Sequence, residues 1–485
     1  MNWRAVLHTL AYLAILLAFC MAAPLSVAFI HRTDDPRWQW EIASFLVPMA
    51  LSLGAGLWMK RLAPTMANIG RREGFAIVTF SWLMMTIIGM LPYIISGTTS
   101  SLSDAFFETM SGFTTTGATI FAKVEVIPKG VQFWRCMTQW LGGMGVVVLS
   151  VAILRFLGVG GYRLLKAEAP GGIVFEREKP RIIETAKELW KLYLGISALQ
   201  VALLKLSGMT LYDSFCHTFT TMSTGGFSPH TESVAYFSSP ITQWIIIVFM
   251  FIAGANFSLY SQFIRLKPGT LLKNPEFRLY TAILLLAVII GLVSVPYAGD
   301  AERHLRDTTF QVVSIATTTG YATVDFDMWP SVMRLVLLLL MFSGGCMGST
   351  GGGIKSARIL IYSKALIREI HRLIYPHTVR PLRVGPKVID RKVVTNIMAF
   401  GWAYLGLFII GCTAVSASGY DLVTSASASA AALGNIGPGL AKVGPTCNWG
   451  HLPDTTKWIM SCLMLLGRLE IFSVIVLFTP WAWKR

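Results

Sequence analysis

Long apolar segments alternate with short polar connectors along almost the whole chain. Many of these segments approach or exceed the roughly 20 residues that an α-helix needs to cross the hydrocarbon core of a bilayer. Residues 5–30 and 40–61 form the first two, and the later segments group into four units of helix, pore loop and helix. The pattern predicts an all-α integral membrane protein of ten spans. Four pseudo-symmetric helix/pore-loop/helix repeats surround one central pore, and an N-terminal helix pair precedes them.

The polar connectors give the boundaries of these units. The apolar run after Met1–Arg4 resembles a signal peptide, but it is too long for one and a second span follows, so a retained helix is expected. The predicted divisions are an N-terminal transmembrane helix pair at 1–68 and pore repeats at 69–160, 180–268, 276–376 and 390–485, with the second helix of the third repeat broken.

Each unit carries an aspartate that is followed, about a dozen residues later, by a glycine, in most units at the end of a small, hydroxyl-rich run. The four intervals are Asp104–Gly117, Asp213–Gly225, Asp307–Gly320 and Asp421–Gly437. A helix of this length, at about 1.5 Å per residue, crosses only part of the hydrocarbon core, so each is predicted to be re-entrant. We expect the aspartates to cap these helices, because a carboxylate accepts the free N–H groups at a helix start.

The residues that end these short helices suit a cation filter. Carbonyl oxygens replace the hydration shell of a cation without a formal charge that would hold it too tightly, and glycine allows the unusual φ values that turn carbonyls toward one axis. The fourth loop lacks the hydroxyls of the others, which predicts modest selectivity for K⁺ and Rb⁺ over Na⁺. The predicted filter, with potassium as its metal ion, consists of Thr115, Thr116, Gly117, Ser223, Thr224, Gly225, Thr318, Thr319, Gly320, Asn435, Ile436 and Gly437.

The formal net charge is +16, although only 14% of the residues are charged. Basic residues collect in alternate connectors, at 60–72, 155–191, 265–278 and 355–392, as expected if all of these face the cytoplasm. Both termini are then cytoplasmic and all four pore loops face outside. Because the charge follows the spans in this way, nucleic-acid binding is excluded as its cause. The seven cysteines and eight histidines are scattered and form no disulfide framework or metal motif.

The second helices of the third and fourth units each carry an interruption. Six glycines occur within residues 344–353, and each costs a helix about 1 kcal/mol relative to alanine, so this span is predicted to be two half-helices joined by a loop. Close packing through small residues is the alternative, and the shorter runs at 142–145 and 253–256 are expected to stay helical. Arg468, near the middle of the span 458–483, is costly if it faces lipid. The predicted gate consists of Gly344, Gly345, Cys346, Met347, Gly348, Ser349, Thr350, Gly351, Gly352, Gly353 and Arg468, and a purely structural role for Arg468 stays open.

Four such units with one filter glycine each, the extra helix pair and the motif from Gly344 to Lys355 resemble the Trk/Ktr/HKT superfamily of cation transporters, and most closely its TrkH branch. The resemblance covers essentially the whole chain. It implies potassium uptake across the bacterial inner membrane through a channel-like pore, with K⁺ as the transported ligand and no covalent cofactor. It also implies a homodimer with one pore per chain and a TrkA-like cytosolic regulatory subunit that binds ATP, ADP or NAD(H).

Lys355 and Arg358, on the inner half of the broken span, are expected to couple the pore to that subunit. The excess positive charge of the cytoplasmic loops also suits anionic lipids, so lipid binding and partner docking both stay open. The chain is not expected to be an enzyme, because it shows neither a nucleophile with a base nor metal-ligand spacing. A secondary active K⁺/H⁺ or K⁺/Na⁺ symporter is the alternative, and Glu108 and Glu470 are its few candidate coupling residues.

Overall fold

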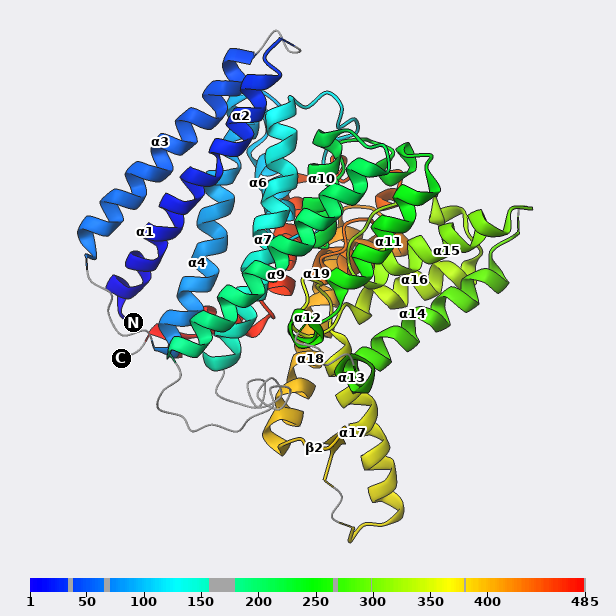
Figure 1. Cartoon of the computed structure of the whole chain (residues 1–485). Helices are drawn as coiled ribbons and strands as arrows, with labels where there is room; N and C mark the ends of the chain where they lie inside the picture. The colour runs from blue at the N-terminus through cyan, green and yellow to red at the C-terminus, as the bar shows by residue number, and fades with distance from the viewer. Residues whose placement is uncertain are drawn as a thin grey trace.

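The computed structural model describes residues 1–33, 38–64, 70–156, 179–264, 269–297, 299–378 and 381–483, which are built almost entirely of α-helices (Figure 1). Parts of the predicted cytoplasmic loops 155–191 and 265–278, the predicted boundaries at 68, 160 and 268, and Lys484 and Arg485 lie outside the described residues.

The first two apolar segments pack side by side along one flank of the molecule (Figure 1). They are α1 (Trp3–Cys20) continued by α2 (Ala22–Ile30), and α3 (Trp38–Leu62). Gly56 permits this close approach, because a Cβ at that position would lie 2.7 Å from the Ile15 side chain. The hydroxyl of Ser52 donates to the carbonyl of Ala14 at 2.7 Å, so the buried polar group in this contact is satisfied.

Four further groups of helices follow, each with a first helix, a short helix and a second helix. The first group contains α4 (Arg71–Gly89), α5 (Leu91–Ile95), α6 (Leu102–Phe113) and α7 (Lys129–Phe156). The second contains α9 (Lys179–Leu206), α10 (Leu211–Met222), η1 (Ser233–Tyr236), α11 (Pro240–Gly254) and α12 (Phe257–Ile264).

The third group contains α13 (Gly269–Lys273), α14 (Pro275–Ser294), α15 (Ala301–Ala316), η2 (Phe326–Met328), α16 (Ser331–Ser343) and α17 (Ser356–Ile374). The antiparallel hairpin of β1 (Arg383–Val384) and β2 (Lys387–Val388) leads to the fourth group. That group contains α18 (Arg391–Ala417), α19 (Leu422–Gly434), η3 (Ala441–Val443), α20 (Asp454–Arg468), α21 (Phe472–Ile475), η4 (Val476–Phe478) and α22 (Pro480–Trp483).

The short helices and second helices of the four groups form a closed ring of contacts. Going around it, α6 contacts α7, α7 contacts α10, α10 contacts α11, and α11 contacts α15. The ring continues from α15 through α16, α19 and α20, and α20 contacts α6 again. Each second helix therefore lies between the short helix of its own group and the short helix of the next.

Within the described residues, six helices are long and apolar enough to cross a membrane, or up to seven if the bent pair α20 and α21 forms one span. The second helices α11 and α16 are apolar but shorter. The chain is thus a multi-pass membrane protein. The rings of Trp3 and Trp483 stack with centroids 5.9 Å apart, so α1 begins where α22 ends. α17 and the hairpin extend from the same end of the molecule (Figure 1).

Two second helices differ from the sequence prediction. The run 253–256 is predicted to stay helical, but α11 ends at Gly254 and α12 begins at Phe257. The glycine-rich segment provides hydrogen-bond partners for the backbone groups that this break leaves without a helical partner. The Cys346 N–H donates to the Gly254 carbonyl at 2.8 Å, and the Phe257 N–H donates to the Gly348 carbonyl at 3.2 Å. The span around Arg468, predicted as one helix, is also interrupted. Arg468 is the last residue of α20, and the chain bends by 109° before the next helix.

Candidate functional site

The loops that follow the four short helices have the same backbone conformation. In each loop a non-glycine residue with positive φ is followed two positions later by a glycine with positive φ. These pairs are Thr115 and Gly117, Thr224 and Gly226, Thr318 and Gly320, and Asn435 and Gly437. Left-handed φ values are uncommon outside glycine. Their fourfold recurrence shows that one conformation is imposed on all four loops.

The hydrogen bonds of the loops repeat in the same register. The N–H of the residue between each pair turns back to a carbonyl of its own short helix. The four bonds are Thr116 to Ser111, Gly225 to Thr220 and Thr319 to Ser314, each at 2.8 Å, and Ile436 to Ala431 at 2.9 Å. The N–H groups of these residues are thereby occupied within their own helix, and their carbonyl oxygens are left for other partners.

This register corrects the predicted filter of the second loop by one residue. Gly226, not Gly225, has a positive φ, of 77°. It therefore corresponds to Gly117 and Gly320, whose φ is 81°. Gly225 takes the place that Thr116 and Thr319 hold in their loops. The prediction selected the first of two adjacent glycines, which shortens the interval from Asp213 by one residue relative to the first and third loops.

The four loops meet one another around a closed circuit. A Cβ on Gly117 would overlap the carbonyl oxygen of Gly225, and one on Gly226 would overlap that of Thr319. A Cβ on Gly320 would in turn overlap the carbonyl oxygen of Ile436. The circuit closes because a Cβ on Gly437 would lie 2.7 Å from the carbonyl oxygen of Thr116. Each glycine thus leaves room for a carbonyl of the next loop, which no side chain would allow.

Side-chain hydroxyls brace two of the loops. The hydroxyls of Thr114 and Thr116 lie 2.8 Å apart, and those of Thr317 and Thr319 lie at the same distance. Amide side chains take this role in the other two. Asn435 Nδ2 donates to Thr116 Oγ1 at 3.0 Å and to the Met464 carbonyl at 2.9 Å.

In the second loop the amide comes from a different helix. Gln139 of α7 donates through Nε2 to the Gly225 carbonyl at 2.8 Å and accepts through Oε1 from the Phe227 N–H at 3.1 Å. Gln139 was not predicted as part of the site, because no sequence pattern around it indicates a contact with a residue 86 positions away.

A buried ion pair backs the first and second loops. Arg135 Nε lies 2.6 Å from Glu108 Oε1, with side chains 2% and 0% exposed. Glu108 also accepts from the Thr119 hydroxyl at 3.0 Å and the Ile120 N–H at 2.9 Å, while Arg135 donates to the Ser228 carbonyl at 3.0 Å. The pair therefore holds the chain leaving both loops, and Arg135 is a second residue that the sequence did not reveal.

The aspartates of the repeat are placed differently from the prediction. Ser101 is the N-cap of α6 and Thr210 that of α10, and each accepts the N–H of the aspartate three residues later. A hydroxyl residue followed three positions later by an acid is typical of a helix start. The prediction considered only the aspartates and therefore missed this pattern. Asp421 does cap α19 as predicted, with its carboxylate accepting the Thr424 N–H at 3.1 Å.

The other aspartates lie in contact with basic side chains. Asp307 lies inside α15, whose N-cap is Asp300. The carboxylates of Asp104, Asp213 and Asp307 lie 2.5 Å from Lys457, 3.1 Å from His230 and 3.6 Å from Arg303. Asp104 and Asp213 therefore tie their short helices to neighbouring elements, whereas Asp307 pairs with a residue one turn earlier in its own helix.

A cavity of about 100 Å³ lies beside the four loops. Its lining includes all four positive-φ glycines, namely Gly117, Gly226, Gly320 and Gly437. Cys447, an exposed free thiol, also lines it. Nearby, Glu125 accepts the N–H of Thr231 at 2.7 Å. Burial raises the pKa of the Glu125 carboxyl, but the hydrogen bonds from Thr231, a backbone hydrogen bond of Glu125 itself and the nearby His230 together lower it by more, so that the pKa lies below its ordinary value.

On the opposite side, the glycine-rich segment touches the loops directly. The Gly352 N–H donates to the Thr318 hydroxyl at 2.8 Å, and the Thr350 hydroxyl donates to the Met222 carbonyl at 3.0 Å. A Cβ on Gly352 would overlap the carbonyl oxygen of Gly434. Residues 344–353 thus contact the ends of the second, third and fourth short helices.

Arg468 holds this segment from the fourth group. Its guanidinium donates to the Thr350 carbonyl at 2.6 Å and to the Gly142 carbonyl at 3.4 Å, and the residue is only 4% exposed. Among the described residues no acidic side chain pairs with it. Its charge is therefore balanced by carbonyl dipoles, which are weaker partners than a carboxylate.

The residues predicted for partner coupling share one acid. Glu470 lies 3.5 Å from Lys355 Nζ and 2.6 Å from an Arg358 guanidinium nitrogen. The Arg358 guanidinium also lies over the ring of Phe400 at 4.0 Å. Glu470 therefore pairs with the third group and not with Arg468.

Comparison with known proteins identifies the group to which this arrangement belongs. The family model for TrkH, a cation transport protein, matches residues 44–482. The chain belongs to the TrkH family. The TrkH protein of Salmonella typhimurium, a Trk system potassium uptake protein, is 38% identical over 100% of both chains, and TrkG of Escherichia coli is 32% identical over 99% of both. The crystal structure of the potassium transporter TrkH from Vibrio parahaemolyticus has a TM-score of 0.91 and 35% identity, covering 100% of each chain.

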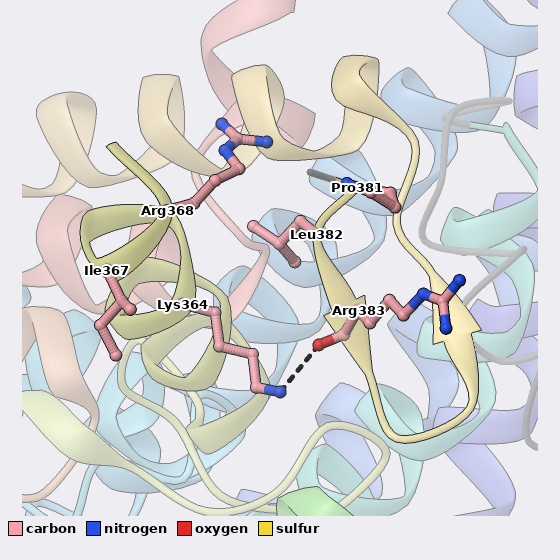
Figure 2. A pocket seen from close by; sticks show the side chains of 6 residues that line it. All are labelled: Lys364, Ile367, Arg368, Pro381, Leu382 and Arg383. Atoms are coloured by element: carbon pink, nitrogen blue, oxygen red, sulfur yellow. Dashed lines mark hydrogen bonds between the residues drawn. The ribbon is translucent and has the colours of Figure 1, made fainter. Parts of the chain in front are cut away.

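This TrkH family member also has a basic cavity beside α17 and the hairpin (Figure 2). Its lining consists of Lys364, Ile367, Arg368, Pro381, Leu382 and Arg383. Lys364 Nζ donates to the Arg383 carbonyl at 2.7 Å and so ties the helix to the hairpin. The guanidinium groups of Arg368 and Arg383 point in different directions, away from the buried Leu382 between them (Figure 2). The cavity therefore has a basic rim but no convergent anion site.

Proposed function

We propose that this chain takes K⁺ into the bacterial cell through a gated, channel-like pore enclosed by its four repeated loops. The closed circuit of glycine and carbonyl contacts carries the proposal, because carbonyl oxygens around one axis can replace the hydration shell of a cation. The potassium uptake named for the TrkH and TrkG relatives points to the same ion.

The ion path in this proposal runs between the positive-φ glycines and their preceding residues. It keeps the predicted filter residues and adds Gly226, which takes the glycine position of the second loop, while Gly225 takes the middle position. The fourth loop has an amide and Ile436 where the first and third have hydroxyls, and the second has Gly225 at the middle position. Irregular ligands favour modest selectivity, with K⁺ and Rb⁺ preferred over Na⁺.

The gate in this proposal is residues 344–353 together with Arg468. The segment lies against the inner ends of the short helices, and a positive charge beneath a cation filter opposes permeation unless it moves or is screened. The Arg468 contact with the Thr350 carbonyl joins the two parts, so opening requires that this hydrogen bond break.

The proposed assembly is a homodimer in the inner membrane with cytoplasmic termini. A TrkA-like subunit that binds ATP, ADP or NAD(H) would dock on the basic cytoplasmic face. Anionic lipid headgroups are the other partners that the basic rim of Lys364, Arg368 and Arg383 suits.

Coupled symport is the less favoured function. Coupling residues exchange protons or ions, and Glu108 and Glu470 are the acids that the sequence indicates as candidates. Both already hold basic partners, Arg135 in one case and Lys355 with Arg358 in the other. Both carboxylates are thus already engaged in ion pairs with residues of this chain.

Uptake of ⁸⁶Rb⁺ into liposomes that contain the purified chain tests the proposal. We expect uptake driven by a K⁺ gradient, competition by K⁺ more than by Na⁺, and no dependence on an imposed pH gradient. Accumulation of Rb⁺ against its gradient when a pH or Na⁺ gradient is imposed would establish symport instead.

A further inference from the structure

The backbone is strained where α20 bends into α21. Glu470 and Ile471 have φ values of 58° and 57°, and Ile471 has a ψ of −63°. The Phe472 N–H donates to the Glu470 carbonyl at 2.6 Å, which makes Ile471 the centre of a γ-turn of the rare positive-φ form. A β-branched residue is especially disfavoured there. Such strain persists only where the surroundings hold it, and it gathers at switch regions.

A second strained residue lies at the end of the glycine-rich segment. Lys355 has a φ of 73° and directly precedes α17. The Glu470 carboxylate reaches both Lys355, at 3.5 Å, and Arg358, at 2.6 Å. A single side chain therefore connects the bend of the fourth group to the point where the glycine-rich segment ends.

Packing fixes the bend on its other side. Ile471 is fully buried, and its N–H donates to the Leu466 carbonyl at 2.8 Å. A Cβ on Gly467 would overlap the carbonyl oxygen of Leu433, so the end of α20 lies directly against the end of α19. Release of the bend would therefore act both on Arg468 and on the fourth short helix.

We propose that Glu470 is a positioning residue for the gate: its ion pairs with Lys355 and Arg358 hold the strained turn at Ile471 and keep residues 344–353 under the filter. The ion pairs thus hold the turn in a conformation of higher energy than a straighter chain. When the ion pairs break, the strain favours a straighter chain after Arg468, which withdraws the arginine from the Thr350 carbonyl. This inference rests on the proposed function and adds a residue that the predicted gate did not contain.

Two neighbouring substitutions give opposite expected results in planar-bilayer recordings of the purified full chain. Glu470→Gln removes the restraint and raises the open probability by roughly tenfold, as expected for the loss of charged hydrogen bonds. Ile471→Gly removes the strain without changing charge, which stabilises the bent state and lowers the open probability severalfold. Single-channel conductance stays unchanged in both, because neither residue is placed in the filter.

Matched variants separate this device from a general structural role. Ile471→Ala truncates the same side chain but keeps the Cβ that makes positive φ costly, so it should leave the open probability nearer to that of the parent chain. Glu369→Gln breaks the ion pairs with Arg368 and Arg372 farther along α17 and should change nothing. Exchanging the charges in Glu470→Arg with Arg358→Glu should restore most of the closed behaviour that Glu470→Arg loses.

Equal loss of activity in Glu470→Gln and Ile471→Gly would overturn the inference, because it would indicate damage to folding alone. A lower conductance in Glu470→Gln would also overturn it, since two unpaired cations would then be acting on the ion path itself. If the parent chain conducts no K⁺ or Rb⁺, the proposed function fails. If the parent conducts and both variants gate as it does, only the role of Glu470 fails.

Discussion

The four loops form a regular side of the ring, and the second helices form an irregular side. In the loops, four different sequences adopt one backbone, with positive φ at the same two positions and the same hydrogen bond to the preceding helix. The second helices differ from one another: α11 stops for two residues, α16 gives way to a glycine-rich segment, and α20 is followed by a bend of 109°. The proposed function explains the contrast, because a filter needs regular ligands around one axis, whereas a gate needs segments that can move.

The largest effect on uptake is expected at a loop glycine that contacts the backbone of the next loop. Gly226→Ala should lower ⁸⁶Rb⁺ uptake by roughly 100-fold, because its Cβ would overlap the backbone of Thr319, and a displacement of about 1 Å in a site costs that much. Gly195→Ala in α9 is the control, since nothing lies within 4 Å of the position its Cβ would take. An equal loss of uptake in both variants would show that the overlap with Thr319 is not the cause.

The buried ion pair between Arg135 and Glu108 supports only the first and second loops, and its contribution can be tested by measuring the stability of the protein. Arg135→Met should destabilise the chain by about 3–5 kcal/mol, because it leaves the buried Glu108 carboxylate without its cation. Arg135→Met with Glu108→Gln should recover much of the loss. Thermal unfolding of the detergent-solubilised chain measures both. A double variant no more stable than the single one would contradict the ion-pair explanation.

On the irregular side, loss of Arg468 should open the path. Arg468→Ala should raise ⁸⁶Rb⁺ uptake by about tenfold, since it removes a charged hydrogen bond to Thr350 and a positive charge beneath the filter. Shortening the segment 345–351 should act in the same direction. Unchanged uptake in both variants would show that neither element limits the flux.

The smallest effect uses a natural thiol at the outer cavity. A cationic, membrane-impermeant methanethiosulfonate should modify Cys447 and lower uptake severalfold, because the added positive charge repels K⁺ near the filter glycines. Cys447→Ser should abolish the response, whereas Cys462→Ser, which removes an exposed thiol on α20, should preserve it. Inhibition that persists in Cys447→Ser would separate the cavity from the ion path.

The repeat could be predicted from the sequence because each loop carries a glycine between apolar runs, preceded by a threonine in three of the four loops. The error at Gly225 arose where two glycines are adjacent and only backbone conformation distinguishes them. The capping residues Ser101 and Thr210 were also local, and their spacing to the aspartates would have revealed them.

Other parts of the site depend on partners that are far apart in the chain. Arg135 meets Glu108 from another helix, and Glu470 meets Arg358 across 112 positions. The break after Gly254 likewise depends on the glycine-rich segment that receives its carbonyl. No periodicity marks such pairs, since they are fixed by how whole helices pack.

The contact between Gly437 and the first loop sets a condition on the order in which the protein is made. During synthesis the first three loops emerge one after another, yet the circuit stays open at both ends until the last unit enters the membrane. Gly320 has no carbonyl to receive until Ile436 arrives, and the carbonyl of Thr116 waits for the same segment. A chain that stops before residue 437 would therefore insert its earlier helices and still lack the contact that closes the circuit.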